Sequence, residues 1–474
     1  MKHMMNRTRR SIPKFEYERN KMKSEADDAP VLDERKYGTL NRSKVYERMA
    51  GQTGVALLNG GGLEHRRWTD TESTFRQESY FYYLTGIREP GYSIVLDMET
   101  CRSILYTPVF EKDHTLWHGA PQSDDSIKER YGVDAVFTQD DLRSHLKKAK
   151  LVHVLDIGEY KDGKAEDKFL LTAIAESRVI KSEMELDMMR YAAQVSGKAH
   201  IEVMKEAKSA KNERALDALF KYHCARMNGH EQAYTPILAG GKRGAILHYN
   251  RNDADMPLAL DELFLIDAGC EYLCYASDIT RTYPCGGVFY DDYDTIYEIV
   301  LNAQEAVLAV LNADVHWEDM HRLAAKVILQ GLLEAEIVQG TEKDLLDNHI
   351  AALFFPHGLG HLIGLDVHDC GGYPKGVERI DEPGIRYLRM RRQLKENMVV
   401  TVEPGVYFID AILDPAVADP NISRFLNLPV LERFREKIGG VRIEDDVVIL
   451  KDGIENLTGW IPKTIEEIEK IMNL

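Results

Sequence analysis

Three apolar segments in the second half of the chain are each interrupted by an acidic residue. Asp267 stands in LFLIDAG, Glu403 in VVTVEPG and Glu444 in VRIEDDVV, and each run has the composition of a buried β-strand. A buried carboxylate without a partner is costly, so each acid requires a cation or hydrogen-bond donors. A single acid in an apolar segment is commonly a surface residue at the end of a strand. Three acids in three such segments are better explained by a metal ion that they share.

Asp278 adds a fourth carboxylate, eleven residues after Asp267. A continuous strand would separate the two by roughly 36 Å and place them on opposite faces. The chain must therefore fold back between them, and Gly269 offers a flexible point for this. Cys270 and Cys274 would lie about 13 Å apart along a strand, too far to form a disulfide. The acids, rather than these cysteines, are the candidate ligands.

Imidazole ligands are expected in FFPHGLGHLIGLDVHDCGGYP, where His357, His361 and His368 lie among glycines. The first two are four residues apart, as in zinc-binding helices, but Gly358 and Gly360 disfavour a regular helix. We expect one histidine to be a ligand and the others to donate protons or hydrogen bonds. Oxygen-rich sites with one imidazole suit Mn²⁺ or Co²⁺ better than structural zinc. Two such ions, about 3.5–4 Å apart, can hold a hydroxide and polarise a carbonyl.

Composition bounds the class of protein and of partner. The 474 residues suffice for two or three domains, and 44% hydrophobic with 29% charged residues is typical of soluble globular proteins. A formal net charge of −17 argues against nucleic acid or an anionic membrane surface as the main partner. No segment approaches the roughly 18 apolar residues of a membrane-spanning helix. Six cysteines without framework spacing favour a reducing compartment, and we expect the cytosol.

The chain divides into three parts. Residues 1–35 are polar, and we expect a mobile tail, with a mitochondrial presequence as the alternative. Residues 36–177 alternate strand-like runs (VALLNG, YSIVLDM, SILYTP, LVHVLDI) with helical stretches such as SDDSIKERYG, which predicts an α/β domain. Residues 178–474 combine a few long helices with hairpin strands, which predicts an α+β arrangement.

Helices of the second domain are marked by local signals. Ser182 and Glu185 form a capping box at a helix start. Apolar residues follow at helical spacing and predict a core-packing face: Met188, Met189, Ala192, Val195, Ala199 and Val203. NERALDALFKYHCARMNG predicts a helix ended by Gly229, and DTIYEIVLNAQEAVLAVLNA and WEDMHRLAAKVILQGLLEAE predict two more.

These residues together resemble a known family. Asp267, Asp278, His361, Glu403 and Glu444 have the order and approximate spacing of the five ligands of the dinuclear "pita-bread" metallopeptidases. HGLGHLIGLDVHD looks like the proline-peptidase signature, supported by TVEPGVYF and GGVRIEDDVV, and the similarity extends from FRQESYFYYLTGIREPGY to IPKTIEEIEKIM. It implies a C-terminal pita-bread catalytic domain after a creatinase-like α/β domain. The nearest members are eukaryotic-type Xaa-Pro dipeptidases, with Xaa-Pro aminopeptidases as close relatives.

The resemblance implies the metal ligands. Asp278 and Glu444 would bridge two divalent ions, Asp267 would complete one ion, and His361 with Glu403 would complete the other. Glu403 would also act as a proton shuttle for the attacking water. The ions are expected to be Mn²⁺, with Co²⁺ or Zn²⁺ as alternatives.

The substrate residues are implied in the same way. His248 and His368 resemble histidines that contact the substrate and stabilise the tetrahedral intermediate or protonate the leaving nitrogen. Tyr234 and Arg442 resemble further site positions, and His357 is expected among the substrate contacts. The implied substrate is a small peptide with proline in second position, whose scissile bond is a tertiary amide without an N–H.

Arg389, in GIRYLRMRRQL, bears on the choice between dipeptides and longer peptides. It resembles the arginine that binds the free carboxylate of a dipeptide, for which a guanidinium is the natural partner. The alternative is a solvated basic cluster with Arg386, Arg391 and Arg392. The segment YFYYLTG is typical of the aminopeptidases, so both activities stay open. A non-enzymatic pita-bread binding protein is disfavoured because all five ligands are present. The resemblance also implies a homodimer through the N-terminal domains.

Overall fold

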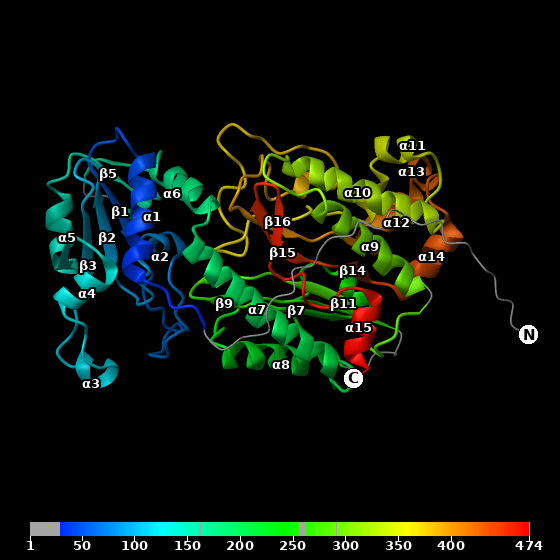
Figure 1. Ribbon diagram of the computed structural model, residues 1–474, viewed down its shortest axis with the longest axis horizontal. Helices are drawn as coiled ribbons and strands as arrows, with labels where there is room; N and C mark the ends of the chain where they lie inside the picture. Colours follow the sequence, from blue (N-terminus) through cyan, green and yellow to red (C-terminus); the bar gives the residue numbers. More distant parts are fainter. Residues whose placement is uncertain (1–28, 161–162, 256–261, 291, 474) are drawn as a thin grey trace, which may run out of the picture.

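The computed structural model describes residues 29–160, 163–255, 262–290 and 292–473. The chain forms a smaller N-terminal lobe and a larger C-terminal lobe (Figure 1). Most of the expected tail, residues 1–28, lies outside the described residues. Helix α1 (Glu34–Arg48) begins directly after Asp33, whose side chain accepts a hydrogen bond from the amide of Lys36 as an N-cap.

The N-terminal lobe is a six-stranded sheet with helices beside it, as the alternating pattern predicted. The strand order is β4-β3-β2-β1-β5-β6, with β1–β2 and β2–β3 antiparallel and β3–β4 and β1–β5 parallel. The strands are β1 (Val55–Asn59), β2 (Ser93–Asp97), β3 (Ser103–Thr107), β4 (Ala135–Thr138), β5 (Val152–His153) and β6 (Ala165–Glu166). The helices after α1 are α2 (Ser79–Thr85), α3 (His114–His118), α4 (Asp124–Tyr131), α5 (Gln139–Leu146) and α6 (Leu170–Val179).

The C-terminal lobe places strands between two groups of helices. Figure 1 shows α7 and α8 on one side of the strands and α9 and α10 on the other. The predicted capping box at Ser182 and Glu185 starts α7. The helices are α7 (Glu183–Glu206), α8 (Glu213–Arg226), α9 (Asp292–Leu308), α10 (Trp317–Glu334), α11 (Glu342–Asp347), α12 (Asp410–Ala418), α13 (Pro420–Ser423), α14 (Leu428–Lys437) and α15 (Ile465–Met472).

The strands of this lobe form short antiparallel ladders. One sheet has the order β11-β8-β7 and another β12-β15-β16, while β13 pairs with β14 and β9 with β10. Their bounds are β7 (Ile237–Gly240), β8 (Leu263–Asp267), β9 (Glu271–Tyr272), β10 (Tyr275–Ala276), β11 (Thr280–Pro284), β12 (Val399–Val402), β13 (Gly405–Tyr407), β14 (Gly440–Arg442), β15 (Asp445–Leu450) and β16 (Gly453–Asn456). The hairpin-built α+β arrangement predicted for this half is confirmed.

Buried apolar side chains connect the two lobes. One core cluster contains Tyr37 and Phe81 of the N-terminal lobe together with Met189, Tyr275 and Leu365 of the C-terminal lobe. The hydroxyl oxygens of Tyr37 and Tyr275 are 2.9 Å apart. Because Tyr275 belongs to the β9–β10 hairpin that follows β8, the N-terminal lobe packs directly behind the segment that carries the first two predicted ligands.

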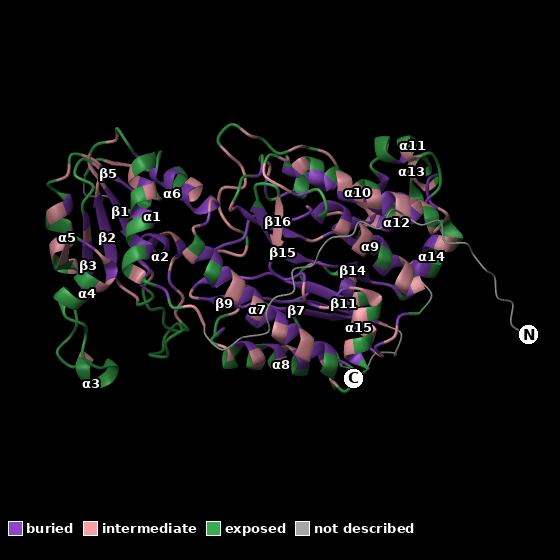
Figure 2. Cartoon of the chain, viewed as in Figure 1, coloured by how far each residue is buried: buried purple, intermediate pink, exposed green. Residues whose placement is uncertain are grey.

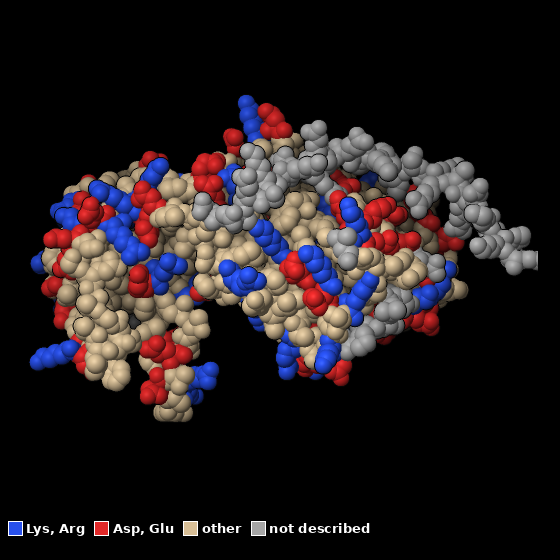
Figure 3. Space-filling model, turned by 60° about the horizontal axis from the view of Figure 1, so that its bottom comes forward, with Lys and Arg blue, Asp and Glu red and all other residues tan. Residues whose placement is uncertain are grey.

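One face of the molecule is mixed in charge. On the face shown in Figure 3, Lys and Arg are interspersed with Asp and Glu. Figure 2 shows that burial is concentrated in the strands of both lobes and that α3 is exposed. Within the described ranges, no helix has the length and apolar character needed to cross a membrane. All six cysteines are free thiols.

Candidate functional site

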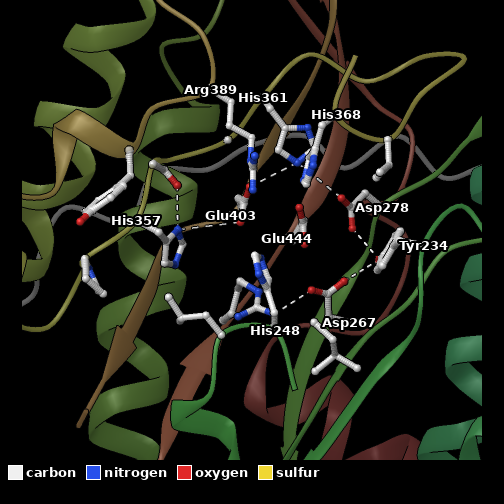
Figure 4. Close-up of a pocket in the computed structure, with 18 of the residues that line it drawn as sticks. Tyr234, His248, Asp267, Asp278, His357, His361, His368, Arg389, Glu403 and Glu444 are labelled. Atoms are coloured by element: carbon white, nitrogen blue, oxygen red, sulfur yellow. Dashed lines mark hydrogen bonds and ion pairs between the residues drawn. The ribbon is translucent and has the colours of Figure 1, made fainter. Parts of the chain in front are cut away.

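Asp267 and Asp278 are brought together by the fold-back that their spacing predicted. Strand β8 ends at Asp267, β11 begins at Thr280, and the antiparallel register pairs these two residues. Asp278, two residues before Thr280, therefore lies at the same end of the ladder as Asp267. The two carboxylates point into one space, as Figure 4 shows.

The turn between them differs from the expectation. The chain reverses at Leu273 and Cys274, whose φ angles are 47° and 66°, rather than at Gly269. Gly269 is required for a different reason, because a Cβ there would collide with the backbone carbonyl of Ser277. It permits a close approach of two strands and does not supply flexibility.

Glu403 and Glu444 occupy a gap between two ladders. β12 pairs with β15 and β13 pairs with β14, and both glutamates lie where the first ladder ends and the second begins. Pro404, next to Glu403, has no N–H and cannot continue the pairing. The interruption lets both carboxylates turn toward the end of β8 and β11, where Glu444 forms a bridge with Thr280.

His361 is held without a helix, as its flanking glycines predicted. Its backbone N–H donates to Thr401 Oγ1 at 3.1 Å, and its Nδ1 lies 3.1 Å from the Leu362 carbonyl. With the proton on Nδ1, Nε2 presents a lone pair to the carboxylates. This Nε2 lies 3.5 Å from Asp278 Oδ2 and 3.5 Å from Glu403 Oε1.

The electrostatics of this cluster favour a bound cation. Burial raises the pKa of Glu403 to about 8, with a further contribution from Asp278, and burial raises the pKa of Asp267 to about 6. Burial also raises the pKa values of Asp278 and Glu444. Candidate ligand atoms of Asp278, His361 and Glu444 all lie within 4.8 Å of one another. Three buried acids, the partly exposed Glu403 and the neutral imidazole of His361 are a donor set that fits divalent ions.

Two further side chains connect the carboxylates. The Tyr234 hydroxyl lies within hydrogen-bond distance of both Asp267 and Asp278, and its single proton can serve one of them at a time. The Arg442 guanidinium donates to Asp267 Oδ2 at 2.7 Å, to the Tyr407 hydroxyl at 2.9 Å and to Thr280 Oγ1 at 3.1 Å. Arg442 therefore acts as a counterion within the cluster, with its three nitrogens engaged by protein groups.

The remaining histidines surround the carboxylates. His357 Nδ1 lies 2.8 Å from the Gly358 carbonyl, and its Nε2 accepts from the Tyr407 hydroxyl at 2.9 Å. The His368 ring stands perpendicular to that of His361, with 4.5 Å between centroids. Burial lowers the pKa of both His357 and His368 to about 3, so both rings are neutral at pH 7. In Figure 4, His248 lies across the carboxylates from His361 and His368.

One cavity of about 1130 Å³ unites all of these groups. Every site residue expected from the sequence lines it, namely Tyr234, His248, Asp267, Asp278, His357, His361, His368, Arg389, Glu403, Arg442 and Glu444. The structure thus assembles residues that are more than 200 positions apart in the sequence. It shows their proximity, whereas their individual roles stay predictions.

Arg389 differs from the arginines around it. Arg386 pairs with Asp381, Arg391 donates to Glu318 and the Glu378 carbonyl, and Arg392 donates to Glu176 and the Gly371 carbonyl. For Arg389, the described residues provide no hydrogen bond or ion pair, and its side chain points toward the carboxylate cluster (Figure 4). Of these four cations, it is the one available to an anionic group inside the cavity.

Two residues of the site escaped sequence analysis. Tyr407 links Arg442 to His357, and the Thr280 hydroxyl donates to Glu444 Oε2 at 2.6 Å. Both stand in strand-like segments where aromatic and β-branched residues are typical of packing. Nothing local distinguishes them from core residues.

Comparison with known proteins agrees with this geometry. Residues 187–451 match the metallopeptidase family M24, and residues 39–153 match the aminopeptidase P N-terminal domain. The chain is 42% identical over 457 residues to human Xaa-Pro dipeptidase, covering 91% of this chain and 92% of that protein. It is 40% identical over 441 residues to a probable Xaa-Pro aminopeptidase of Sordaria macrospora, covering 90% and 93%.

Two solved aminopeptidase structures have a fold similar to that of this chain. Pseudomonas aeruginosa aminopeptidase PepP superposes with a TM-score of 0.79 at 30% identity, covering 94% of this chain and 99% of that one. Escherichia coli aminopeptidase P with the inhibitor Pro-Leu superposes with a TM-score of 0.79 at 29% identity, covering 93% and 98%. The expected pita-bread catalytic domain after a creatinase-like N-terminal domain is confirmed, and this chain belongs to the metallopeptidase family M24.

Proposed function

We propose that the chain is an Xaa-Pro dipeptidase, which hydrolyses the bond before proline in dipeptides. The observation that carries this proposal is the position of Arg389, a cation that faces the same cavity as the carboxylate cluster and has no hydrogen-bond or ion-pair partner among the described residues. A dipeptide bound with its scissile bond at that cluster has its free carboxylate one residue away. A guanidinium binds such a carboxylate through two hydrogen bonds. The identity to human Xaa-Pro dipeptidase supports the same activity.

The proposal includes the metal ligands. Asp267, Asp278, His361, Glu403 and Glu444 would hold two divalent ions, with Asp278 and Glu444 shared between them, Asp267 serving one ion, and His361 with Glu403 serving the other. The mutually repelling carboxylates support this assignment, because a bound cation relieves the repulsion that raises the pKa values of Glu403 and Glu444. We propose Mn²⁺ as the ion, with Co²⁺ or Zn²⁺ as alternatives. Metal analysis of the purified chain and reactivation of the metal-free chain with each ion test the choice.

The side chains of the cavity have separable tasks. Two divalent cations, when bound, supply a Lewis acid and a water of lowered pKa at the scissile carbonyl. Glu403 reaches His361 at 3.5 Å and His357 at 3.9 Å, which places it to hold a proton released during the attack. The leaving proline nitrogen has no N–H and must gain that proton. The neutral ring of His368 and the side chain of His248 face the cavity, where each can donate an N–H to the developing oxyanion or to this nitrogen.

The alternative is an Xaa-Pro aminopeptidase that acts on longer peptides. The cavity of about 1130 Å³ is larger than the roughly 300–1000 Å³ typical of small-ligand pockets, which favours this alternative. Hydrolysis of Ala-Pro and Ala-Pro-Ala by the metal-loaded chain separates the two. Rapid tripeptide cleavage with negligible dipeptide cleavage would refute the dipeptidase.

Arg389→Ala tests the carboxylate contact itself. Loss of a hydrogen bond to a charged group costs about 1.5–3 kcal/mol, so KM for Ala-Pro should rise about 10- to 100-fold. The tripeptide, whose carboxylate lies one residue further on, should be affected much less. Arg391→Ala is the matched control, since that guanidinium is already engaged by Glu318 and the Glu378 carbonyl. Equal effects of Arg389→Ala on both peptides would remove Arg389 from the site.

We also propose a domain division at residues 36–177 and 178–474, a homodimer and a cytosolic location. The two matched families, at 39–153 and 187–451, support the division.

Helix α3 exposes Leu116 (75%) and Trp117 (72%) on an arm away from the body of the lobe, which favours a protein contact there (Figures 1 and 2). Light scattering should give a dimer mass that Trp117→Asp reduces. Free thiols support a reducing compartment.

A further inference from the structure

A buried amide fills the gap between the two ladders that present Glu403 and Glu444. Gln304, on α9, has no solvent exposure, and its Nε2 donates to the carbonyls of Val402 at 3.1 Å and Ile443 at 3.2 Å. These are the residues directly before the two glutamates. A side-chain amide has two N–H groups, so both carbonyls can be satisfied at once. Gln304 thus ties together the two chain segments where backbone pairing is interrupted.

The orientation of this amide is set by Lys463. Its ammonium group, 1% exposed, donates to Gln304 Oε1 at 2.7 Å. Lysine is a donor only, so the oxygen of the amide must face Lys463 and the nitrogen must face the two carbonyls. A flipped amide would direct N–H groups at an ammonium and an oxygen at two carbonyls, which is unfavourable on both sides.

The same network extends to the third ligand-bearing segment. Lys463 also donates to Asp445 Oδ2 at 2.8 Å, and Asp445, the residue after Glu444, accepts from Arg281 at 2.7 Å. Arg281 in turn donates to the carbonyls of Glu444 at 2.7 Å and Thr280 at 2.9 Å. All of these groups are buried. One hydrogen-bonded network therefore contacts the backbone beside Glu403, beside Glu444 and at the start of β11, close to Asp278.

We propose that Gln304 is a positioning residue for the metal centre, which fixes the separation of Glu403 and Glu444 by bridging the carbonyls before them. The inference rests on the proposed metal ligands and goes beyond them, because Gln304 itself does not line the cavity. Without the amide, two buried carbonyls lose their donor, and the gap is spanned by the longer backbone hydrogen bond from the Ile443 N–H to the Pro404 carbonyl at 3.4 Å, which holds the two segments less firmly. Supporting groups of this kind hold ligands in place, and their loss typically weakens metal binding about 10- to 100-fold.

Metal binding by the full chain tests the proposal. The metal-free protein is titrated with Mn²⁺ by calorimetry, and with Co²⁺ by visible absorption, which reports ligand geometry. Gln304→Met keeps the length of the side chain and removes both donors. Gln330→Met is the matched control, because Gln330 is a helix glutamine of α10 that bonds Glu342, away from the site. Gln304→Met should weaken Mn²⁺ binding about 10- to 100-fold and alter the Co²⁺ spectrum, and Gln330→Met should change neither.

The outcomes separate this inference from the proposed function. If Gln304→Met lowers only the unfolding temperature of the metal-free protein, with Mn²⁺ affinity and Co²⁺ spectrum unchanged, its role is structural and the proposal is overturned. If Gln304→Met does not fold, Gln304→Glu is measured instead and judged by the same criteria. This substitution keeps the side-chain volume and the contact with Lys463 but removes both N–H donors. Asp278→Asn checks the site itself. If Asp278→Asn still binds Mn²⁺ normally, the proposed metal ligands are refuted. If Asp278→Asn loses Mn²⁺ binding but Gln304→Met binds Mn²⁺ normally, only the inference about Gln304 is refuted.

Discussion

Arg178 holds the segment that carries His368, and its replacement should be strongly destabilising. The guanidinium is 1% exposed and donates to Asp366 Oδ2 and Asp369 Oδ1, both at 2.6 Å. These aspartates lie on either side of His368 in the sequence. Arg178 belongs to α6, at the junction with the N-terminal lobe, and Lys181 adds a contact of 2.9 Å to Asp369. The junction between the lobes therefore positions a cavity residue.

The magnitude follows from the exposure of each partner. Breaking a buried ion pair by removing one member costs about 3–5 kcal/mol. The pair with Asp369, also 1% exposed, belongs to this class, whereas Asp366 is 42% exposed and its pair contributes less than about 1 kcal/mol. Lys181 remains to compensate Asp369 in part. We expect Arg178→Met to lower the free energy of unfolding by about 3 kcal/mol.

Urea unfolding at 25 °C measures this difference, with Arg190→Met as the matched control. Arg190 also bonds several acids, but its side chain is 30% exposed, and its partners Glu183, Asp187 and Glu455 are 73%, 54% and 28% exposed, whereas Asp369 is 1% exposed. Its loss should cost less than about 1 kcal/mol. Arg178→Met should in addition lower kcat/KM for Ala-Pro, because His368 loses its support. Equal losses of stability in the two variants would refute the reasoning.

Three further predictions concern charge, metal and backbone. Burial would raise the pKa of Asp445, but Lys463 and Arg281 lower it below its usual value. The ionised Asp445 carboxylate therefore stabilises the folded chain above about pH 4, and this stabilisation is lost as the pH falls further. Asp445→Asn should flatten that acid dependence in urea titrations and cost about 3–5 kcal/mol at pH 7; an unchanged slope would contradict this. Adding Mn²⁺ at 100 times its Kd should stabilise the metal-free chain by about 2.7 kcal/mol, and chelation should reverse it, as thermal unfolding will show. Gly269→Ala should disrupt the β8–β11 segment and lower the unfolding temperature strongly, whereas Gly62→Ala, with open space around it, should be nearly neutral; similar effects of both would argue against the close approach.

Local patterns were sufficient for much of this protein. Acids within apolar strands identified Asp267, Glu403 and Glu444 as exceptional, because burying a charge is costly whatever the fold. The capping box before α7 and the glycines beside His361 likewise act over a few residues, and the structure has the helix start and the irregular loop that they predicted. Such signals can be read from the sequence since their physical causes are short in range.

Other features were decided only by tertiary structure. Gln304 is one of several polar residues on α9, and its two acceptors lie 98 and 139 residues away. Gly269 was expected to be a flexible point, but the strand that passes against it determines its role. Arg442 and Tyr407 acquire their partners from segments that meet only in the folded chain. The sequence by itself determined which residues need compensation for burial, and the tertiary structure decided which groups supply it, because hydrogen bonds and ion pairs depend on distances in space that no local pattern encodes.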